Sequence, residues 1–411
     1  MPALWHTRRV PAPLDAGQRR LIAFLSVATF FEGYDFFALA QILPELRAEM
    51  GLNRADAGWL LALVNAGTML GGFLVRQADR VGRRKVLTWT IIGYTICSFL
   101  TALAPNIWMF AAAQVAARVF LIGEWAIAMV YAAEEFPADR RGFVIGVVQA
   151  FSSLGAIVCA GVVPLLLHTA WGWRSVYAVG TIPLLIVAFA RRNLQETRRF
   201  AASGPPPASA PWALLAGPLR GRVLLVAAIW ALTYVCTQNA ITFWKEFAMA
   251  ERSFSAEDVG HTLTLGALGS LPLLFLTGRL LDRLGRRVGG VLIFLTCIVG
   301  TVCAYTLNTR IGLGFAVVAG IYGTNAVLPV LNAYTAELFP TERRADAFAL
   351  ANSMLGRVGY VLSPIAVGMA AESWGWGPSV AATAVGPTLA LLLLWALLPE
   401  TRGRELEETS R

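Results

Sequence analysis

Three acidic side chains of this chain stand inside long apolar stretches, where an isolated charge is costly. Glu32 and Asp35 are three residues apart, so a helix would place both on one face. An ionised carboxylate at the depth of a lipid bilayer costs about 2.5–3.5 kcal/mol. Because two such carboxylates on one face also repel each other, we expect at least one to hold a proton at neutral pH. Together with Glu124, the third acid, they are candidates for reversible proton binding.

Two arginines also lie inside apolar stretches. A guanidinium is always charged there and can hold a carboxylate through two hydrogen bonds. Arg118 shares a helical stripe with Gln114 and Trp125, and we expect this stripe to face a cavity and contact a substrate. Arg357 lies in a later stretch and could bind a substrate anion. The alternatives are permanent ion pairs, for example between Arg118 and Asp35, which would neutralise the acid.

Neutral polar residues recur at helical spacing in the same stretches. Amides and phenols can orient a polar ligand without the cost of a buried charge. Each of them could instead make a hydrogen bond between helices. The candidates for substrate contact are Tyr34, Gln149, Tyr234, Gln238, Asn239, Tyr322 and Asn325.

The composition indicates which elements must position these residues. Of the 411 residues, 57% are hydrophobic and only 14% are charged, whereas soluble domains carry about 25% charged residues. Apolar blocks recur along the chain, each long enough to cross a hydrocarbon layer of about 30 Å as a helix. The net charge of +9 does not indicate nucleic-acid binding, because the basic residues form short clusters between the apolar blocks. The sequence therefore predicts an all-α polytopic membrane protein.

The apolar blocks predict twelve transmembrane helices. They lie at residues 20–45, 56–77, 85–104, 107–134, 141–168, 174–191, 221–247, 257–281, 288–307, 310–337, 345–370 and 376–398. A segment that holds Gly204 and four prolines cannot continue a helix and is expected to be a linker. We expect an N-terminal six-helix bundle at 1–195, a cytosolic linker at 196–219, a C-terminal six-helix bundle at 220–398 and a cytosolic tail at 399–411.

The basic residues predict the orientation of the chain in the membrane. Most of the 34 lysines and arginines fall on the side that holds both termini and the linker. Cytosolic loops carry an excess of such residues. We therefore expect both termini in the cytosol of a multi-pass protein, and the richness in alanine and arginine indicates a bacterial inner (cytoplasmic) membrane.

The second half of the sequence repeats motifs of the first. The segment Asp79–Arg84 recurs as Asp282–Arg287, and Trp171–Trp173 recurs as Trp374–Trp376, both at an offset of 203 residues. Repeated motifs in the same order at one offset predict a duplicated six-helix unit. Two such pseudo-symmetric bundles, with a site between them near the membrane midplane, are the plan of many secondary transporters.

These repeats resemble the turn motif of the major facilitator superfamily, and the resemblance covers nearly the whole chain. Phe31–Phe37 is similar to the first-helix motif of the metabolite:proton symporters, with Gly33 where that group usually has Trp. Gly123–Trp125 is similar to the same group, and the chain also resembles the aromatic-acid and sugar porters. The resemblance implies alternating access and coupling to protons, and it favours Asp35 over Glu32 as the proton carrier.

The resemblance also implies a cytosolic gate at the repeated turns. The acids of the turns would pair with bases on neighbouring helices when the cytosolic side is closed. Alternatively, these residues only anchor the helices on the cytosolic side and end them. The candidate gate residues are Asp79, Arg80, Arg83, Glu135, Arg141, Asp282, Arg283, Arg286 and Glu337.

The function expected from the sequence is proton-coupled symport of a small organic anion by alternating access. The expected partners are a small-molecule substrate with a carboxylate, protons and the lipid bilayer. We expect no cofactor, no metal, no nucleic acid and a monomer. No stretch combines a nucleophile, a base and a metal set, so an enzyme is not expected. The alternatives are a proton-driven exporter or antiporter of amphipathic compounds and a non-transporting nutrient receptor on a transporter scaffold.

Overall fold

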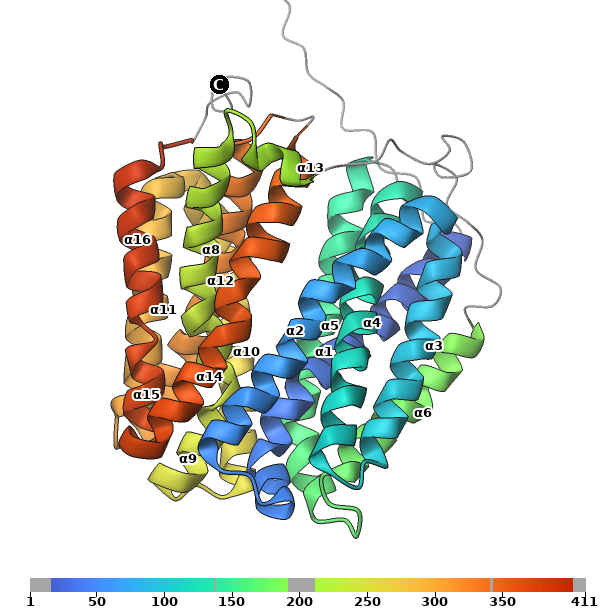
Figure 1. The fold of residues 1–411 in the computed structure, drawn as a ribbon, viewed down its shortest axis with the longest axis vertical. Helices are drawn as coiled ribbons and strands as arrows, with labels where there is room; N and C mark the ends of the chain where they lie inside the picture. The colour runs from blue at the N-terminus through green and yellow to red at the C-terminus, as the bar shows by residue number, and fades with distance from the viewer. Residues whose placement is uncertain (1–15, 137, 191–210, 341–342, 402–411) are drawn as a thin grey trace, which may run out of the picture.

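The computed structural model describes residues 16–136, 138–190, 211–340 and 343–401, and these ranges contain helices and no β-strand. The first half supplies α1 (Ala16–Met50), α2 (Arg54–Val81), α3 (Arg83–Ala102), α4 (Ile107–Glu135), α5 (Ala138–Leu167) and α6 (Arg174–Ala190). The second half supplies the short η2 (Pro211–Leu215), α8 (Arg220–Thr242), α9 (Trp244–Arg252), α10 (Ala256–Leu284), α11 (Arg286–Thr306), α12 (Arg310–Glu337), α13 (Arg344–Phe348), η3 (Ala349–Gly356), α14 (Arg357–Trp374), α15 (Trp376–Ala382) and α16 (Val385–Leu397). Figure 1 shows the two groups of helices as two bundles side by side.

The predicted all-α membrane fold is confirmed. Within the described ranges, eleven helical segments are long and apolar enough to cross a membrane, with α13, η3 and α14 taken as one segment and α15 with α16 as another. The remaining predicted helix, at 174–191, corresponds to α6, whose 17 residues end where the described range ends. The count of twelve spans therefore stays a prediction. So do the bundle boundaries, because residues 191–210 lie outside the described ranges.

Two predicted helices are interrupted in the second half, and a change in backbone hydrogen bonding accompanies each break. The predicted helix 221–247 ends at Thr242 and resumes as α9, because the Tyr305 hydroxyl donates to the carbonyl of Ala240 (3.0 Å) near the end of α8. The predicted helix 376–398 is divided between α15 and α16. Pro387, one turn beyond this break, has no N–H to donate to the carbonyl of Thr383.

A third difference is a π-helical segment. The predicted helix 345–370 consists of α13, the π-helical η3 and α14. Such segments are rare and often lie near functional sites. Arg357 follows η3 directly as the first residue of α14.

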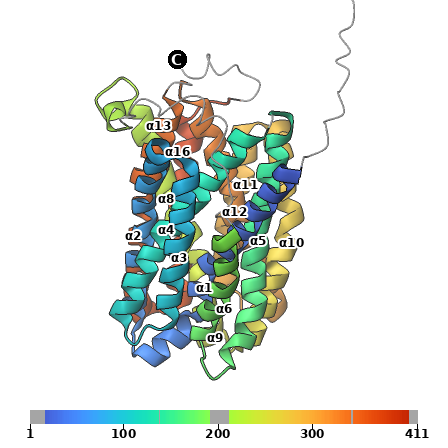
Figure 2. The ribbon, with the colours of Figure 1, turned by 90° about the vertical axis from the view of Figure 1, so that its right-hand side faces the viewer.

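Close backbone contacts join the two bundles. A Cβ atom at Gly58 of α2 would lie 2.3 Å from the carbonyl oxygen of Pro364 in α14, and one at Gly368 would lie 2.7 Å from the carbonyl oxygen of Arg54. Gly260 of α10 packs in the same way against α5. Glycines permit this approach, as small residues do between transmembrane helices. Figure 1 shows α2 and α14 converging toward the end of the molecule that holds α9, and Figure 2 shows the bundles from the side of α3 and α6.

Charged residues of α1 and α9 cross between the bundles at this end, which we call the α9 end. The Lys245 ammonium is 2% exposed and donates to the carbonyl of Gln41 and to Glu45 Oε1 (2.7 Å). Arg47 Nη1 donates to Glu246 Oε2 (2.6 Å). Burial lowers the pKa of Lys245 and raises the pKa of Glu246, and the partner charges on α1 oppose both shifts. The ion pairs therefore offset part of the cost of burying these two groups.

A carboxylate also joins the bundles at the α9 end. Glu372 of α14 accepts hydrogen bonds from the backbone N–H groups of Arg54 (2.7 Å) and Ala55 (3.0 Å), so it caps the N-terminus of α2 from the other bundle. His168, which follows α5, and Glu257 of α10 form another contact between the bundles at the surface, where His168 Nε2 lies 2.9 Å from Glu257 Oε1. The bundles are closed against each other at the α9 end, opposite the end that holds the described C-terminal residues (Figure 1).

Replacing one member of the buried ion pair should open the α9 end. In the Glu45→Gln variant, the Lys245 ammonium would lose its ionic partner in the closed state, which typically costs about 3–5 kcal/mol. Leu263, a buried residue of α10, offers a position for a reporter cysteine. With the five native cysteines replaced, a membrane-impermeant maleimide added at the α9 side should label Leu263→Cys at least about tenfold faster in the variant.

The double variant Glu45→Gln/Lys245→Met is the control, because it removes both charges and should label slowly again. Equal labelling of the Glu45→Gln variant and the parent chain would show that this ion pair does not hold the bundles together.

Candidate functional site

A cavity of about 300 Å³ lies between the two bundles. Helices α1, α2, α4 and α5 of the first bundle and α8, α10 and α12 of the second line it. It brings together five of the predicted site residues, namely Glu32, Arg118, Gln149, Gln238 and Asn325. The candidate site is therefore formed by both halves of the chain.

Arg118 of α4 is buried in the wall of this cavity with 4% of its surface exposed. Its guanidinium lies 4.5 Å from the centre of the Phe36 ring, and its Nη1 atom has no hydrogen-bond partner. Between the residues that the structure describes, no carboxylate lies within ion-pair distance of Arg118. A buried, unpaired guanidinium is costly, and a ligand carboxylate would offset that cost.

The three intramembrane acids occupy different positions around Arg118. Glu32 lines the cavity, interacts electrostatically with Arg118 and has an unpartnered Oε2 atom. Asp35 is buried outside the cavity lining, where it interacts electrostatically with Arg118. Glu124 is buried and accepts a hydrogen bond from Thr90 Oγ1 (2.7 Å). Of the three acids, Glu32 is the one in the cavity wall.

The crossing of α1 and α5 positions Glu32. A Cβ atom at Gly33 would lie 1.9 Å from the carbonyl oxygen of Ser152, and one at Gly155 would lie 1.9 Å from that of Phe30. The two backbones therefore touch at Gly33, next to Glu32. A tryptophan at this position, as in the symporters that the motif resembles, would not fit this crossing.

The second bundle contributes neutral amides to the cavity. Gln238 Nε2 donates to Thr242 Oγ1 (3.2 Å) within α8, and Asn325 Nδ2 donates to the carbonyl of Ile321 (2.8 Å) within α12. These bonds use one N–H of each amide and leave the amide oxygens available. Gln149 of α5 lies in the wall on the first-bundle side.

Other predicted contact residues lie outside the cavity lining and bond to protein groups. Gln114 donates to Thr101 (3.3 Å), the Tyr34 hydroxyl donates to the carbonyl of Val176 (3.2 Å), and Asn239 donates to Ser363 (2.9 Å). The Tyr322 hydroxyl accepts from Thr277 (3.5 Å), and the half-buried Trp125 does not line the cavity. In this conformation, Gln114 and Asn239 bond to side chains of neighbouring helices, and Tyr34 bonds to a backbone carbonyl.

Arg357 and Tyr234 belong to a second polar cluster beside η3, outside the cavity lining. The Tyr234 hydroxyl donates to Asn352 Oδ1 (2.8 Å), and the Tyr234 and Tyr360 rings are 5.4 Å apart. The Arg357 guanidinium lies 5.8 Å from the centre of the Tyr360 ring, and its Nε atom has no hydrogen-bond partner. Tyr360 lies within electrostatic reach of both arginines, but of the two only Arg118 lines the cavity described above.

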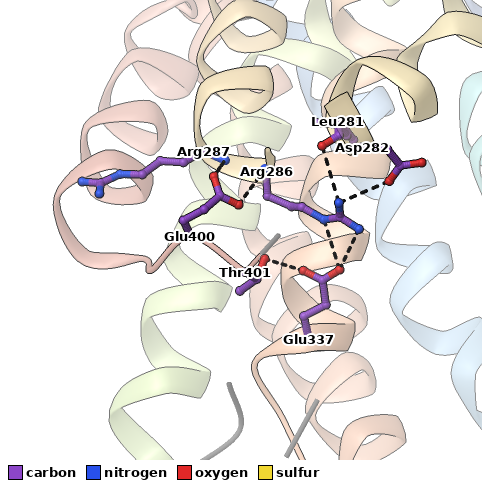
Figure 3. Close-up of polar contacts among 7 residues, drawn as sticks. All are labelled: Leu281, Asp282, Arg286, Arg287, Glu337, Glu400 and Thr401. Carbon is purple, nitrogen blue, oxygen red and sulfur yellow. Dashed lines mark hydrogen bonds and ion pairs between the residues drawn. The ribbon is translucent and has the colours of Figure 1, made fainter. Parts of the chain in front are cut away.

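The repeated turn of the second half holds its charged residues in a network within one bundle (Figure 3). Arg286 bonds to Glu337 (3.1 Å) and to Asp282 (3.2 Å), which links the turn between α10 and α11 to the end of α12. Glu400 accepts from the backbone N–H groups of Arg286 and Arg287, both at 2.9 Å, and thereby caps α11. Arg283 of the predicted gate is exposed.

The corresponding turn in the first half lies partly outside the described side chains. The side chains of Asp79, Arg80 and Arg141 lie outside the described part of the chain. Arg83 Nη1 donates to the carbonyl of Ala78 (3.4 Å), and Glu135 is half-buried at the end of α4. The role of these residues as a gate stays a prediction.

Several cavity residues were not identified from the sequence. Asn65, Ser152 and Ser270 line the cavity, as does the Phe36 ring beneath Arg118. A serine or asparagine in an apolar helix gives no signal that separates a ligand contact from a helix contact. Phe36 follows Asp35 in the sequence, and this position beside a candidate acid is the feature that could have indicated a place in the site.

Comparison with known proteins relates this fold to transporters. The sequence profile of the Major Facilitator Superfamily matches residues 25–249 and 231–411. The "Probable 4-methylmuconolactone transporter" of Cupriavidus pinatubonensis is 29% identical over 92% of this chain and 89% of its own. The cis,cis-muconate transport protein of Acinetobacter baylyi is 28% identical over 87% of this chain and 88% of its own. The inward open structure of the xylose transporter XylE from Escherichia coli is similar in fold, with a TM-score of 0.76 at 18% identity over 95% of this chain and 98% of that one.

The hydrogen bond between Thr90 and Glu124 should contribute measurably to stability. In the Thr90→Val variant, which keeps the shape of the side chain, the buried carboxyl group would lose one donor. A hydrogen bond within a protein contributes about 0.5–1.5 kcal/mol. We expect a lower melting temperature of the purified protein in detergent for Thr90→Val, and a nearly unchanged one for Thr90→Ser, which retains the hydroxyl. Identical melting temperatures for both variants would contradict a stabilising role of this bond.

Proposed function

Because this chain belongs to the major facilitator superfamily, and is thus a multi-pass membrane transporter of a small molecule, we propose that it is a proton-coupled symporter of a small carboxylate. The observation that carries the proposal is the unpaired guanidinium of Arg118 in the cavity wall. A substrate carboxylate would accept two hydrogen bonds from it and neutralise its charge. The related protein named for cis,cis-muconate, which carries two carboxylates, supports a carboxylate as the substrate class but not the number of carboxylates.

The position of Glu32 supports coupling to protons. Glu32 and the proposed substrate carboxylate would face the same guanidinium across one cavity. Two anions repel each other at such a site, so binding of the substrate carboxylate favours the protonated form of Glu32. Substrate and proton would then bind together and leave together, which is the requirement for symport. Asp35, which also interacts with Arg118, would hold a second carboxyl group behind the cavity wall.

The closed α9 end supports alternating access. We propose from the distribution of lysine and arginine that both termini face the cytosol of a bacterial inner membrane. The α9 end is then the external side, and the described conformation is closed to the outside. Transport would break the contacts of Lys245, Glu246 and Glu372 across the bundles and form new contacts at the opposite end.

The two intramembrane arginines provide a matched test in proteoliposomes. We expect a proton gradient, acid outside, to drive accumulation of one member of a panel of radiolabelled monocarboxylates and dicarboxylates. The Arg118→Gln variant should lower this accumulation at least about tenfold, because it removes the charge that holds the carboxylate. Arg357→Gln removes the same charge outside the cavity and should retain most of the activity.

The same assay contains the outcomes that would overturn the proposal. An equal loss of accumulation in the Arg118→Gln and Arg357→Gln variants would show that the position of Arg118 in the cavity wall does not decide carboxylate binding. Accumulation that does not depend on the gradient would exclude proton coupling. Gradient-driven extrusion of amphipathic cations, unaffected by Arg118→Gln, would favour an exporter.

A further inference from the structure

We infer that the cavity selects a substrate with a single carboxylate at one end and a hydroxylated, uncharged group at the other, and that it discriminates against dicarboxylates. This inference rests on the proposed function and specifies its substrate class. It follows from three features of the cavity, which are the distribution of charge, the hydrogen-bonding capacity of the second-bundle wall and the apolar surface between the two walls.

The charged groups of the cavity all come from the first bundle. Among the residues that line it in the structure, Arg118 is the one cation and Glu32 the one acid. The second bundle contributes uncharged polar groups, from Gln238, Ser270 and Asn325 among others. A carboxylate that pairs with Arg118 therefore points the rest of its molecule toward a neutral wall.

Two other cations, Arg357 and Lys245, do not line the cavity. Arg357 lies outside the cavity lining, beside Tyr360. Lys245 is buried at the α9 end and bonds to Glu45. A second carboxylate of the substrate would therefore be desolvated against amides and a hydroxyl, without an opposite charge. The penalty for an unpaired buried ion is several kcal/mol, which would weaken binding strongly.

The wall of the second bundle offers more acceptors than donors. Ser270 donates its only hydroxyl hydrogen to the carbonyl of Ala267 (2.8 Å). Gln238 and Asn325 each use one N–H within their own helix. The lone pairs of these three side-chain oxygens remain for a ligand, and they outnumber the remaining donors, which are one N–H on each amide and the Thr242 hydroxyl. A hydroxyl or N–H group of the substrate satisfies them, whereas a methyl group leaves them without a donor.

The surface between the charged and the neutral wall is apolar. Phe36 and Phe37 of α1, Ile241 of α8 and Leu271 and Leu274 of α10 contribute to the lining. This surface favours a hydrocarbon chain or ring between the two polar ends of the substrate. The cavity volume of about 300 Å³ limits that part to a small molecule.

Two matched series of ligands test this selectivity on the purified protein in nanodiscs. Each series varies only the group opposite the carboxylate. One consists of hexanoate, 6-hydroxyhexanoate and adipate, and the other of benzoate, 4-hydroxybenzoate and terephthalate. Affinities are measured by isothermal titration calorimetry. We expect the hydroxylated monoanion of at least one series to bind best, the unsubstituted acid about 5–10-fold more weakly, and the dianion at least about 30-fold more weakly.

Substitution of Gln238 should change this order in a predictable direction. Gln238→Lys adds a cation to the neutral wall and should make the dianion the best ligand of its series. Gln238→Leu should reduce the difference between the hydroxylated and the unsubstituted acid without loss of the latter. Melting temperatures of both variants identify any loss of folding, and Arg118→Gln should abolish binding of every carboxylate in the series.

The outcomes separate this inference from the proposal on which it rests. Binding of a dianion as tight as that of the hydroxylated acid would overturn the selectivity and leave the carboxylate symporter intact. Equal affinity for the hydroxylated and unsubstituted acids would overturn the role assigned to the neutral wall. Absence of binding by all six carboxylates to the folded parent protein would overturn the proposed function and the inference together.

Discussion

Arg118 places a permanent positive charge inside an otherwise apolar set of helices, and much of the site is arranged around it. The guanidinium lies over Phe36, and Glu32 and Asp35 lie within its electrostatic reach without forming an ion pair. A charge in this position is stable only if nearby groups or a ligand compensate for the loss of hydration. Glu32 and Asp35 supply part of this compensation. A ligand carboxylate paired with Arg118 would supply the rest, which is the basis of the proposed substrate class.

Backbone contacts between helices fix the geometry around that charge. Gly33 and Gly155 bring α1 and α5 into direct contact, and Gly58 and Gly368 do the same for α2 and α14 across the bundles. The first contact sets the direction of Glu32, and the second closes one end of the cavity. Lys245 adds a buried ion pair to that closure. Because the glycine contacts join backbone to backbone, rotation of a side chain cannot release them, and a change at the α9 end would displace whole helices.

The two bundles are related by sequence repeats but divide the chemistry unequally. Gln238 stands at the position that corresponds to Asp35, 203 residues earlier, and the cavity charges come from the first bundle alone. Under the proposed function, the first bundle would bind the proton and the carboxylate, and the second bundle would bind the uncharged part of the substrate. The repeated turn motif keeps a structural role in the second bundle, where Arg286, Glu337 and Glu400 join α10, α11 and α12.

The sequence alone determined the all-helical membrane fold, the repeated organisation and the set of residues from which the site is built, because hydropathy, motif spacing and buried charges are local properties of a chain. Tertiary structure decided which of these residues meet. Glu32 and Arg118 line one cavity, whereas Asp35, Asn239 and Arg357 lie outside its lining, although all five are polar residues in apolar helices. The direction of each side chain depends on how the helices cross, at Gly33 and Gly58 for example, and on breaks such as Phe243. These features arise from contacts between residues far apart in sequence, which periodicity cannot reveal.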